Sequence, residues 1–407
     1  MNVSSMSFGK SEYNEYSSLD EPLDQCDLPM NFSESETKIY EYAETDRVIN
    51  GVLLPVILGL GILSNFAFLY VVYCVKRMRT STNYCLTNLA IADVLFLLGS
   101  VGSKIWKYSQ SPISIDDSSL GRAGCIIIYL ISDTAFLFSL ADITLVSFQK
   151  FYAVCSAHRA LGDSRRRVFV RLLAASWILA FCIALTFIPC TMDYVVICSS
   201  WPSKMPYQNW PNEFAYCGPV KEWTIIYGAG AQAIPFILIF PINVYLYCRI
   251  ISGITQVIED TSVTGRRRIN IRQRNQIAVM LIVNGVVFFI CLAPFEIMSL
   301  FYMIGFIRER FILHEDTRNS LISAARIMSY INAAINPFVY TCMSTQYRDA
   351  FRQTFGLQRC DQPGSATEQE SIFKHLRRLS YNITASTSAG GGLRLYHGVH
   401  ARSRTDS

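Results

Sequence analysis

Polar side chains within apolar stretches are the residues of this sequence whose types and spacing could bind an ion or a ligand. Asp93 is a carboxylate in the middle of one apolar stretch, and Asn332 and Asn336 lie one helical turn apart in another. Together with Ser139 and Asn65 they would supply carboxylate, hydroxyl and amide oxygens, which suit a hard monovalent cation and water. The alternative is a protonated Asp93 that the asparagines satisfy without any ion. The sequence therefore predicts a buried polar network with Asp93 as the candidate sodium ligand, and no other cofactor.

A second group of residues lies nearer one end of the apolar stretches. Asp133 and Glu296 are acids in two different stretches, both toward the same side of the predicted bundle. If a water-filled pocket opens there, two carboxylates favour a ligand that carries a cationic group. The alternative is that both acids reach the lipid headgroups. The predicted ligand-binding residues are Asp133, Glu296, Phe136, Ser299 and Arg326.

Residues 321–343 contain a proline inside an otherwise apolar stretch, where Pro337 directly follows Asn336. A proline inside a helix removes one backbone hydrogen bond and bends the helix. In lipid, the carbonyl freed by this loss must find another partner. This stretch is therefore either a buried polar patch that joins neighbouring helices or a hinge in a membrane switch.

The composition indicates an integral membrane protein. Of 407 residues, 51% are hydrophobic and only 16% are charged, and several windows of about 20 residues contain no lysine or arginine. The net charge of +5 does not indicate nucleic-acid binding, because the basic residues lie in short connections between apolar stretches. No nucleotide-binding loop, zinc signature or nucleophile elbow is present, so the sequence does not indicate an enzyme.

Seven apolar segments are long enough to cross a membrane as helices. They lie at about 48–75, 84–107, 122–156, 168–190, 222–252, 272–303 and 318–343. The first, third and fifth connections are rich in arginine and lysine, and positively charged loops stay in the cytoplasm. The amino end is therefore expected outside the cell and the carboxyl end inside. The predicted fold class is an all-α membrane protein, a seven-transmembrane helix bundle with a short amphipathic eighth helix.

The two ends of the chain lack the apolar residues of a core. Residues 1–47 are acidic and are predicted to be a disordered extracellular segment, with glycosylation sequons at Asn2 and Asn31. The bundle covers residues 48–343, and residues 344–360 are predicted to form an amphipathic helix on the membrane surface. Cys360 is a candidate palmitoylation site. Residues 361–407 are predicted to be a disordered cytoplasmic tail with phosphorylation sites.

Of the thirteen cysteines, eleven fall into two groups, Cys190 could belong to either group, and Cys360 lies beyond the last apolar stretch. Most lie inside apolar stretches or at their ends, where a free thiol behaves as a small apolar side chain. Four lie in loops, where they could be oxidised if those loops face the outside. These four are Cys26, Cys125, Cys198 and Cys217.

Six motifs occur in an order that resembles one known family. They are Gly61-Ile-Leu-Ser-Asn65, Leu89-Ala-Ile-Ala-Asp93, Cys125, Trp177, Phe288-Phe-Ile-Cys-Leu-Ala-Pro294 and Asn336-Pro-Phe-Val-Tyr340. Across residues 48–360 the chain is similar to the rhodopsin-type (class A) G-protein-coupled receptors. Within that family it resembles the peptide receptors, such as those for thyrotropin-releasing hormone, ghrelin and neuromedin U.

The resemblance implies roles for several residues. Asp93, Ser139, Asn332 and Asn336 match the sodium pocket of the family, and Cys125 and Cys217 match its outer disulfide bond. Pro294 matches the kink of the sixth helix, which moves on activation, and Tyr340 matches the tyrosine that swings in the same transition. The predicted activation-switch residues are Lys150, Gln149, Phe288, Pro294 and Tyr340.

The chain departs from the family at its activation switch. Gln149-Lys150-Phe151 stands where the family has an acid-Arg-Tyr triplet, and lysine lacks the planar fork of arginine. Arg274 is expected to repel Lys150 where many relatives have an attracting acid. The departure predicts either basal signalling or weak coupling to G proteins. Further departures are Leu292 in place of a tryptophan, and two candidates each for the proline (Pro235, Pro241) and the tyrosine (Tyr245, Tyr247) of the fifth helix.

The function implied by the resemblance is a plasma-membrane receptor that binds an extracellular peptide and engages a heterotrimeric G protein. Arrestin and receptor kinases are expected to act on the tail, and lipid is expected to surround the bundle. One alternative is a binding or scavenging receptor with weak or absent coupling. Another is a transporter or channel, against which stand the odd number of spans and the absence of internal repeats.

Overall fold

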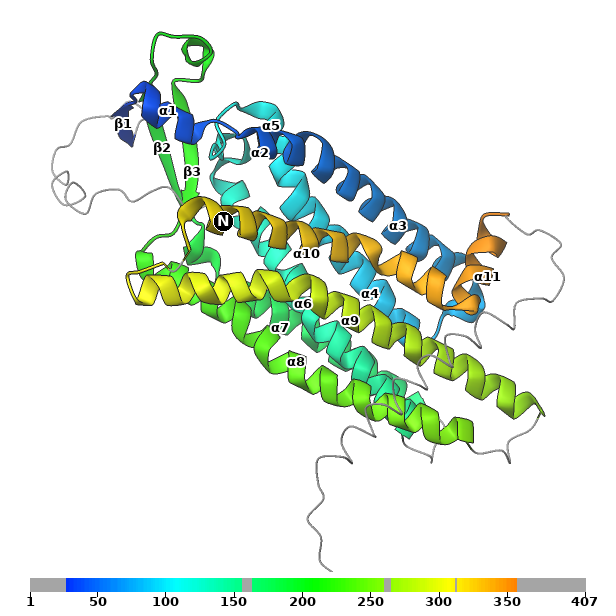
Figure 1. Cartoon of the computed structure of the whole chain (residues 1–407). Coiled ribbons are helices and arrows are strands. Elements are labelled where there is room, and N and C mark those ends of the chain that lie inside the picture. Colours follow the sequence, from blue (N-terminus) through cyan, green and yellow to red (C-terminus); the bar gives the residue numbers. More distant parts are fainter. Residues whose placement is uncertain (1–26, 156–162, 260–264, 312, 357–407) are drawn as a thin grey trace, which may run out of the picture.

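The computed structural model describes residues 27–155, 163–259, 265–311 and 313–356. Long helices run side by side, with a small sheet at one end of the bundle and the short helix α11 at the other (Figure 1). We refer to these two ends as the hairpin end and the α11 end. The helices are α1 Glu34–Tyr40, α2 Glu44–Val48, α3 Leu54–Cys74, α4 Ser81–Phe96, α5 Ser103–Gln110, α6 Gly121–Cys155, α7 Asp163–Leu185, α8 Glu222–Glu259, α9 Gly265–Ile307, α10 Glu315–Met343 and α11 Thr345–Thr354.

Each of the seven expected spans coincides with a helix or a continuous helical run. Turns of π-helix at Ile49–Leu53 and Leu97–Gly102 join α2 to α3 and α4 to α5. Within the described residues, six helical runs have the length and apolar composition of membrane spans. The helix α10 is the seventh and is more polar, since it carries Arg318 and Arg326. It packs against α9 and α3, and Arg318, Asn332 and Asn336 are buried in the bundle.

The helix α6 lies at the centre of the bundle, in contact with α4, α7, α8 and α9. Its middle packs on α7, where the rings of Phe138 and Trp177 stack with centroids 3.9 Å apart. The indole Nε1 of Trp177 donates a hydrogen bond of 3.0 Å to Asn88 Oδ1 on α4. Trp177 therefore joins three helices through one stacking contact and one hydrogen bond.

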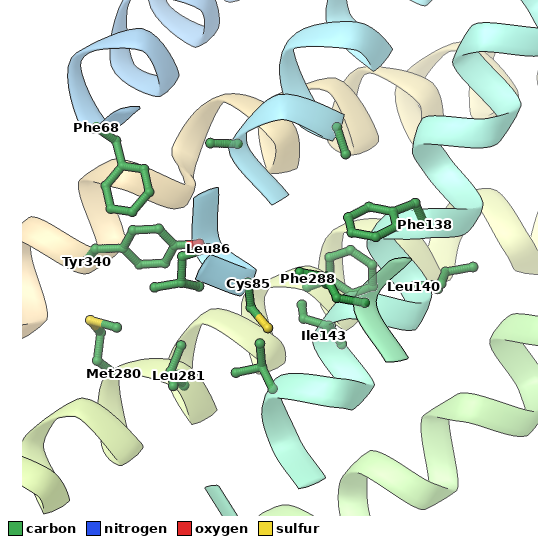
Figure 2. Close-up of a cluster of buried hydrophobic side chains, with 14 of the residues drawn as sticks. Phe68, Cys85, Leu86, Phe138, Leu140, Ile143, Met280, Leu281, Phe288 and Tyr340 are labelled. Atoms are coloured by element: carbon green, nitrogen blue, oxygen red, sulfur yellow. The ribbon is translucent and has the colours of Figure 1, made fainter. Parts of the chain in front are cut away.

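A cluster of buried side chains fills the half of the bundle that lies toward the α11 end. Phe68, Phe138, Phe288 and Tyr340 are each at most 1% exposed. Figure 2 shows the rings of Phe68 and Tyr340 beside each other, and their centroids are 5.4 Å apart. Close packing of this kind makes the interior sensitive to small changes of side-chain volume.

The fifth span, α8, continues through both Pro235 and Pro241. Tyr247 is 8% exposed, whereas Tyr245 is 59% exposed. The hydroxyl of Tyr247 lies against Gly285 on α9, at a place where a Cβ atom on that glycine would overlap it. Of the two candidate tyrosines, Tyr247 is therefore the one that faces the interior.

The sheet at the hairpin end has the strand order β1 (Leu28–Asn31), β2 (Asp193–Ser200) and β3 (Glu213–Gly218). The strands β2 and β3 form an antiparallel hairpin in which Asp193 lies opposite Gly218. The strand β1 comes from the segment before the first span and pairs parallel with β2, with Leu28 opposite Ile197. We call β1, α1, β2, β3 and the turns between β2 and β3 the cap.

The cap has its own apolar core, although its β1 and α1 belong to the segment 1–47 that was expected to be disordered. Phe32 stacks on Trp201 with ring centroids 4.8 Å apart, and Phe214 is only 1% exposed. Ser33 begins α1 with a reciprocal capping box that includes Glu36. The acidic segment cannot bury enough apolar surface alone. It is ordered here because the β2–β3 hairpin supplies both backbone partners and aromatic side chains.

Candidate functional site

A cavity of about 330 Å³ opens at the hairpin end, between the spans and below the cap. Four of the five predicted ligand-binding residues line it, namely Asp133 and Phe136 on α6, Ser299 on α9 and Arg326 on α10. The structure therefore brings together residues from three helices that are distant in the sequence.

Glu296 is the predicted ligand-binding residue that the structure does not place in this cavity. Its side chain is fully buried, with 0% exposure, and neither carboxylate oxygen has a hydrogen-bond partner among the described residues. Glu296 and Ser299 are three residues apart and lie on the same side of α9, yet the packing of the bundle seals Glu296 from the cavity that Ser299 lines. The predicted pair of acids is thus reduced to Asp133 at the cavity wall.

Two lysines of α5 also line the cavity, and they were not among the predicted site residues. Lys107 Nζ forms an ion pair of 2.6 Å with Asp117 Oδ1, and this pair is largely buried. Lys104 lies one turn earlier, with Nζ 5.7 Å from the ring centroid of Tyr330 on α10. One feature of the sequence could have indicated these lysines. Lys104 and Lys107 are three residues apart at the end of an apolar stretch, which places both on one helix face.

The loop before α6 and a disulfide bond hold the cap over the cavity. The carboxylate of Asp117 accepts a hydrogen bond of 2.9 Å from the backbone N–H of Cys217 in β3. Cys217 is disulfide-bonded to Cys125 on α6, with the Cα atoms 5.7 Å apart. This is the pairing that the family resemblance implied. Cys198 in β2 is also disulfide-bonded, whereas Cys26 lies outside the described residues.

The polar network lies deeper in the bundle. Asn336 Nδ2 donates a hydrogen bond of 2.7 Å to Asp93 Oδ2, which joins α10 to α4. Asn65 Nδ2 donates to the backbone carbonyl of Ala333 at 3.0 Å. The Ser139 hydroxyl instead donates to a carbonyl of its own helix at 2.9 Å. Of the predicted network, Asp93, Asn336 and Asn65 are therefore tied to neighbouring helices by direct hydrogen bonds.

Three amide oxygens of this network are buried without a hydrogen-bond partner among the described residues. They are the Oδ1 atoms of Asn65, Asn332 and Asn336. Leaving a buried acceptor unsatisfied costs about 1–3 kcal/mol, and a cation or water would remove that cost. Together with the carboxylate of Asp93, these oxygens form a donor set that suits a hard monovalent cation.

The triplet Gln149-Lys150-Phe151 lies near the α11 end, and hydrogen bonds join it to α4. Lys150 Nζ donates a hydrogen bond of 2.8 Å to Thr82 Oγ1, and the Thr82 hydroxyl donates to Gln149 Oε1 at 3.2 Å. Lys150 is only 8% exposed. A chain of hydrogen bonds from α6 to α4 thus stands where the family resemblance implies an ion pair within the triplet.

Arg274 near the start of α9 contacts α6 rather than an acid. Its Nη1 donates a hydrogen bond of 3.1 Å to the backbone carbonyl of Ala153, three residues after Lys150. The expected repulsion between Arg274 and Lys150 stays a prediction. The hydrogen bond of Arg274 joins the ends of α6 and α9.

The remaining predicted switch residues lie in the buried cluster between these two sites. Phe288 packs edge-to-face on Phe289, with ring centroids 5.5 Å apart, and Pro294 lies inside the continuous helix α9. The ring of Tyr340 lies 5.9 Å from that of Tyr347 on α11, and its hydroxyl has no partner among the described residues. The roles of Phe288, Pro294 and Tyr340 in an activation switch stay predictions.

The fold and the arrangement of these sites define a membrane receptor with seven helical spans. The family model for the seven-transmembrane receptors of the rhodopsin family matches residues 64–340. The chain belongs to this family, as the six motifs predicted, and the family is one of receptors and not of enzymes.

Comparison with individual proteins shows which branch of the family the chain is similar to. The chain is 25% identical to neuromedin-U receptor 2 of Rattus norvegicus over 309 residues, which cover 74% of this chain and 73% of the relative. It is 28% identical to neuromedin-U receptor 1 of Mus musculus over 316 residues, covering 73% and 70%. It is 25% identical to the thyrotropin-releasing hormone receptor of Gallus gallus over 331 residues, covering 75% and 78%. The predicted similarity to this peptide-receptor branch is confirmed.

Proposed function

We propose that the protein is a plasma-membrane receptor for an extracellular peptide, and that it transmits binding to a heterotrimeric G protein. The hairpin end faces the outside and the α11 end faces the cytoplasm. The arginine-rich connections support this orientation, because positively charged loops stay in the cytoplasm. Relatives named as receptors for neuromedin U and thyrotropin-releasing hormone support a peptide ligand.

The observation that carries the proposal is the position of the cavity relative to the helix contacts at the opposite end. Asp133 and Ser299 line the cavity from α6 and α9, and Arg274 joins the same two helices near the α11 end. A ligand that binds one arrangement of α6 and α9 more tightly than another shifts the population between them. A shift from 1:99 to 99:1 requires about 5.5 kcal/mol of differential binding.

Asp93 is proposed to hold a sodium ion, with the amide oxygens of Asn332 and Asn336 as further ligands. The bound ion would supply positive charge that satisfies the buried carboxylate. Because Asp93 lies on α4 and both asparagines lie on α10, an ion there would favour the arrangement in which these helices are close. Sodium would then oppose an activating ligand.

Modification of the two ends of the chain is proposed from sequence signals. Asn31 is exposed in β1, where a glycan on its side chain would project from the cap. Asn2 and Cys360, the other predicted glycosylation and palmitoylation sites, lie outside the described residues. Arrestin and receptor kinases are proposed to act on residues 361–407, which also lie outside the described residues.

A peptide screen in cells that express the chain tests this proposal. Calcium, cyclic nucleotide and arrestin recruitment are recorded together, and every active peptide is repeated on the Asp133→Asn variant. We expect an active peptide whose potency falls about tenfold or more in the variant, since a hydrogen bond to a charged group contributes about 1.5–3 kcal/mol. Peptide binding without output in any of the three readouts would instead support a non-signalling receptor.

A further inference from the structure

The cavity carries two centres of opposite charge, and Lys104 of the basic centre was not among the residues predicted from the sequence. Asp133 lies on α6, and Lys104 on α5 and Arg326 on α10 line the same cavity. Lys107 on α5 lines this cavity as well. The contact between Lys104 and the Tyr330 ring places this lysine between α5 and α10.

Lys104 differs from Lys107 in having no acidic partner within the described part of the chain. Lys107 is neutralised by Asp117 at 2.6 Å. No carboxylate oxygen of the described residues lies within 4.0 Å of Lys104 Nζ. A partly buried ammonium group without an acid loses hydration that no ion pair replaces.

We infer that Lys104 and Arg326 form a subsite for a carboxylate group of the ligand, opposite the subsite for a cationic group at Asp133. The ligand class is then a peptide that carries a guanidinium or amino group and a carboxylate within one or two residues of each other. Tyr129 on α6 lines the cavity together with Arg326 and Asp133, and the cavity holds only about 330 Å³, so a short peptide can reach both subsites. This inference rests on the proposed function, because it assumes that the cavity is the ligand site.

A carboxylate at Lys104 has two chemical sources, the free carboxyl end of a peptide and an acidic side chain. Both supply the same two oxygens to an ammonium or guanidinium donor. Three matched dipeptides separate them. Acetyl-Arg-Gly has a free carboxyl end, acetyl-Arg-Glu-amide has a side-chain carboxylate, and acetyl-Arg-Gln-amide has neither.

Binding of the three dipeptides is measured on the purified full chain in detergent, through the rise in unfolding temperature with ligand concentration. We expect at least one acidic dipeptide to bind about tenfold more tightly than acetyl-Arg-Gln-amide, since a charge-assisted hydrogen bond is gained. The acidic dipeptide that shows the preference identifies the source of the carboxylate. This comparison needs no variant, so it holds even where a substitution prevents folding.

Variants then assign the preference to Lys104. Lys104→Gln should bind all three dipeptides about equally, while Lys104→Arg should keep the preference because it retains the charge. Lys38→Gln, at an exposed lysine of the cap, is the matched control and should also keep it. Equal binding of acidic and neutral dipeptides to the natural chain would overturn the inference, as would a preference that persists in Lys104→Gln.

Asp133→Asn separates failure of this inference from failure of the proposed function. It should weaken all three dipeptides, because each carries the same guanidinium group. If it weakens none while Lys104→Gln removes the acidic preference, the carboxylate subsite stands and the proposed cationic subsite fails. If none of the dipeptides stabilises the natural chain at millimolar concentration, the carboxylate subsite is refuted, and the peptide screen still decides the proposed function.

Discussion

Replacing Arg274 by glutamine is expected to raise signalling in the absence of ligand. Arg274 Nη1 donates a hydrogen bond of 3.1 Å to the carbonyl of Ala153, and this bond joins α9 to α6 near the α11 end. It can form only while the two helices stay close. Since activation in this family moves the sixth span, here α9, outward at this end, the bond stabilises the resting arrangement alone.

The size of the effect follows from the type of bond. A hydrogen bond to a charged group contributes about 1.5–3 kcal/mol, and about 1.4 kcal/mol changes an equilibrium constant tenfold. The half-buried position of Arg274 lets water replace part of the bond, so the lower end of the range applies. An active state populated at about 1% would then rise to about 10%.

The assay is basal second-messenger output in transfected cells, normalised to the amount of receptor at the cell surface. Arg272→Gln is the matched control, because Arg272 is exposed on the same helix. A double change of Gln149→Glu and Lys150→Arg restores the acid–arginine pair of the family and should lower basal output. If Arg274→Gln signals at the level of Arg272→Gln across a panel of G-protein readouts, the reasoning is refuted.

Three further predictions concern the polar network and the cap. Asp93→Asn should abolish any effect of sodium on agonist affinity, and a persisting sodium effect would place the ion elsewhere. Phe214→Ala should destabilise the cap by about 3–5 kcal/mol, since Phe214 is 1% exposed; hydrogen exchange of β1 should speed up while that of the spans does not. Lys204 donates a hydrogen bond of 2.7 Å to Glu34. This bond, and to a smaller extent the positive charge of Lys204, lowers the pKa of Glu34 below the ordinary value of 4.5. The pair therefore stabilises the cap above about pH 4.5 and is lost as the pH falls through the lowered pKa. Trp201 fluorescence should report this acid transition, and Glu34→Gln should remove it.

The spans could be predicted from the sequence because their cause is local. A membrane helix needs about 20 apolar residues whatever it packs against, and the expected segments coincide with the helices of the bundle. The same locality applies to Asp93 and Asn336. An acid and an amide within apolar stretches must find partners inside the protein, and here they find each other at 2.7 Å.

Contacts between residues far apart in the chain decided which side chains line the cavity and whether the cap is ordered. Hydropathy could not distinguish Glu296 from Asp133, because both are acids in apolar helices. In the structure, Glu296 is fully buried outside the cavity, whereas Asp133 lines it. Lys104 was not predicted as a site residue, because its contact with Tyr330 depends on the position of α10 in the bundle. The strand β1 is ordered by a partner about 170 residues away. Composition sets what each segment can bury, whereas tertiary packing selects which neighbours it meets.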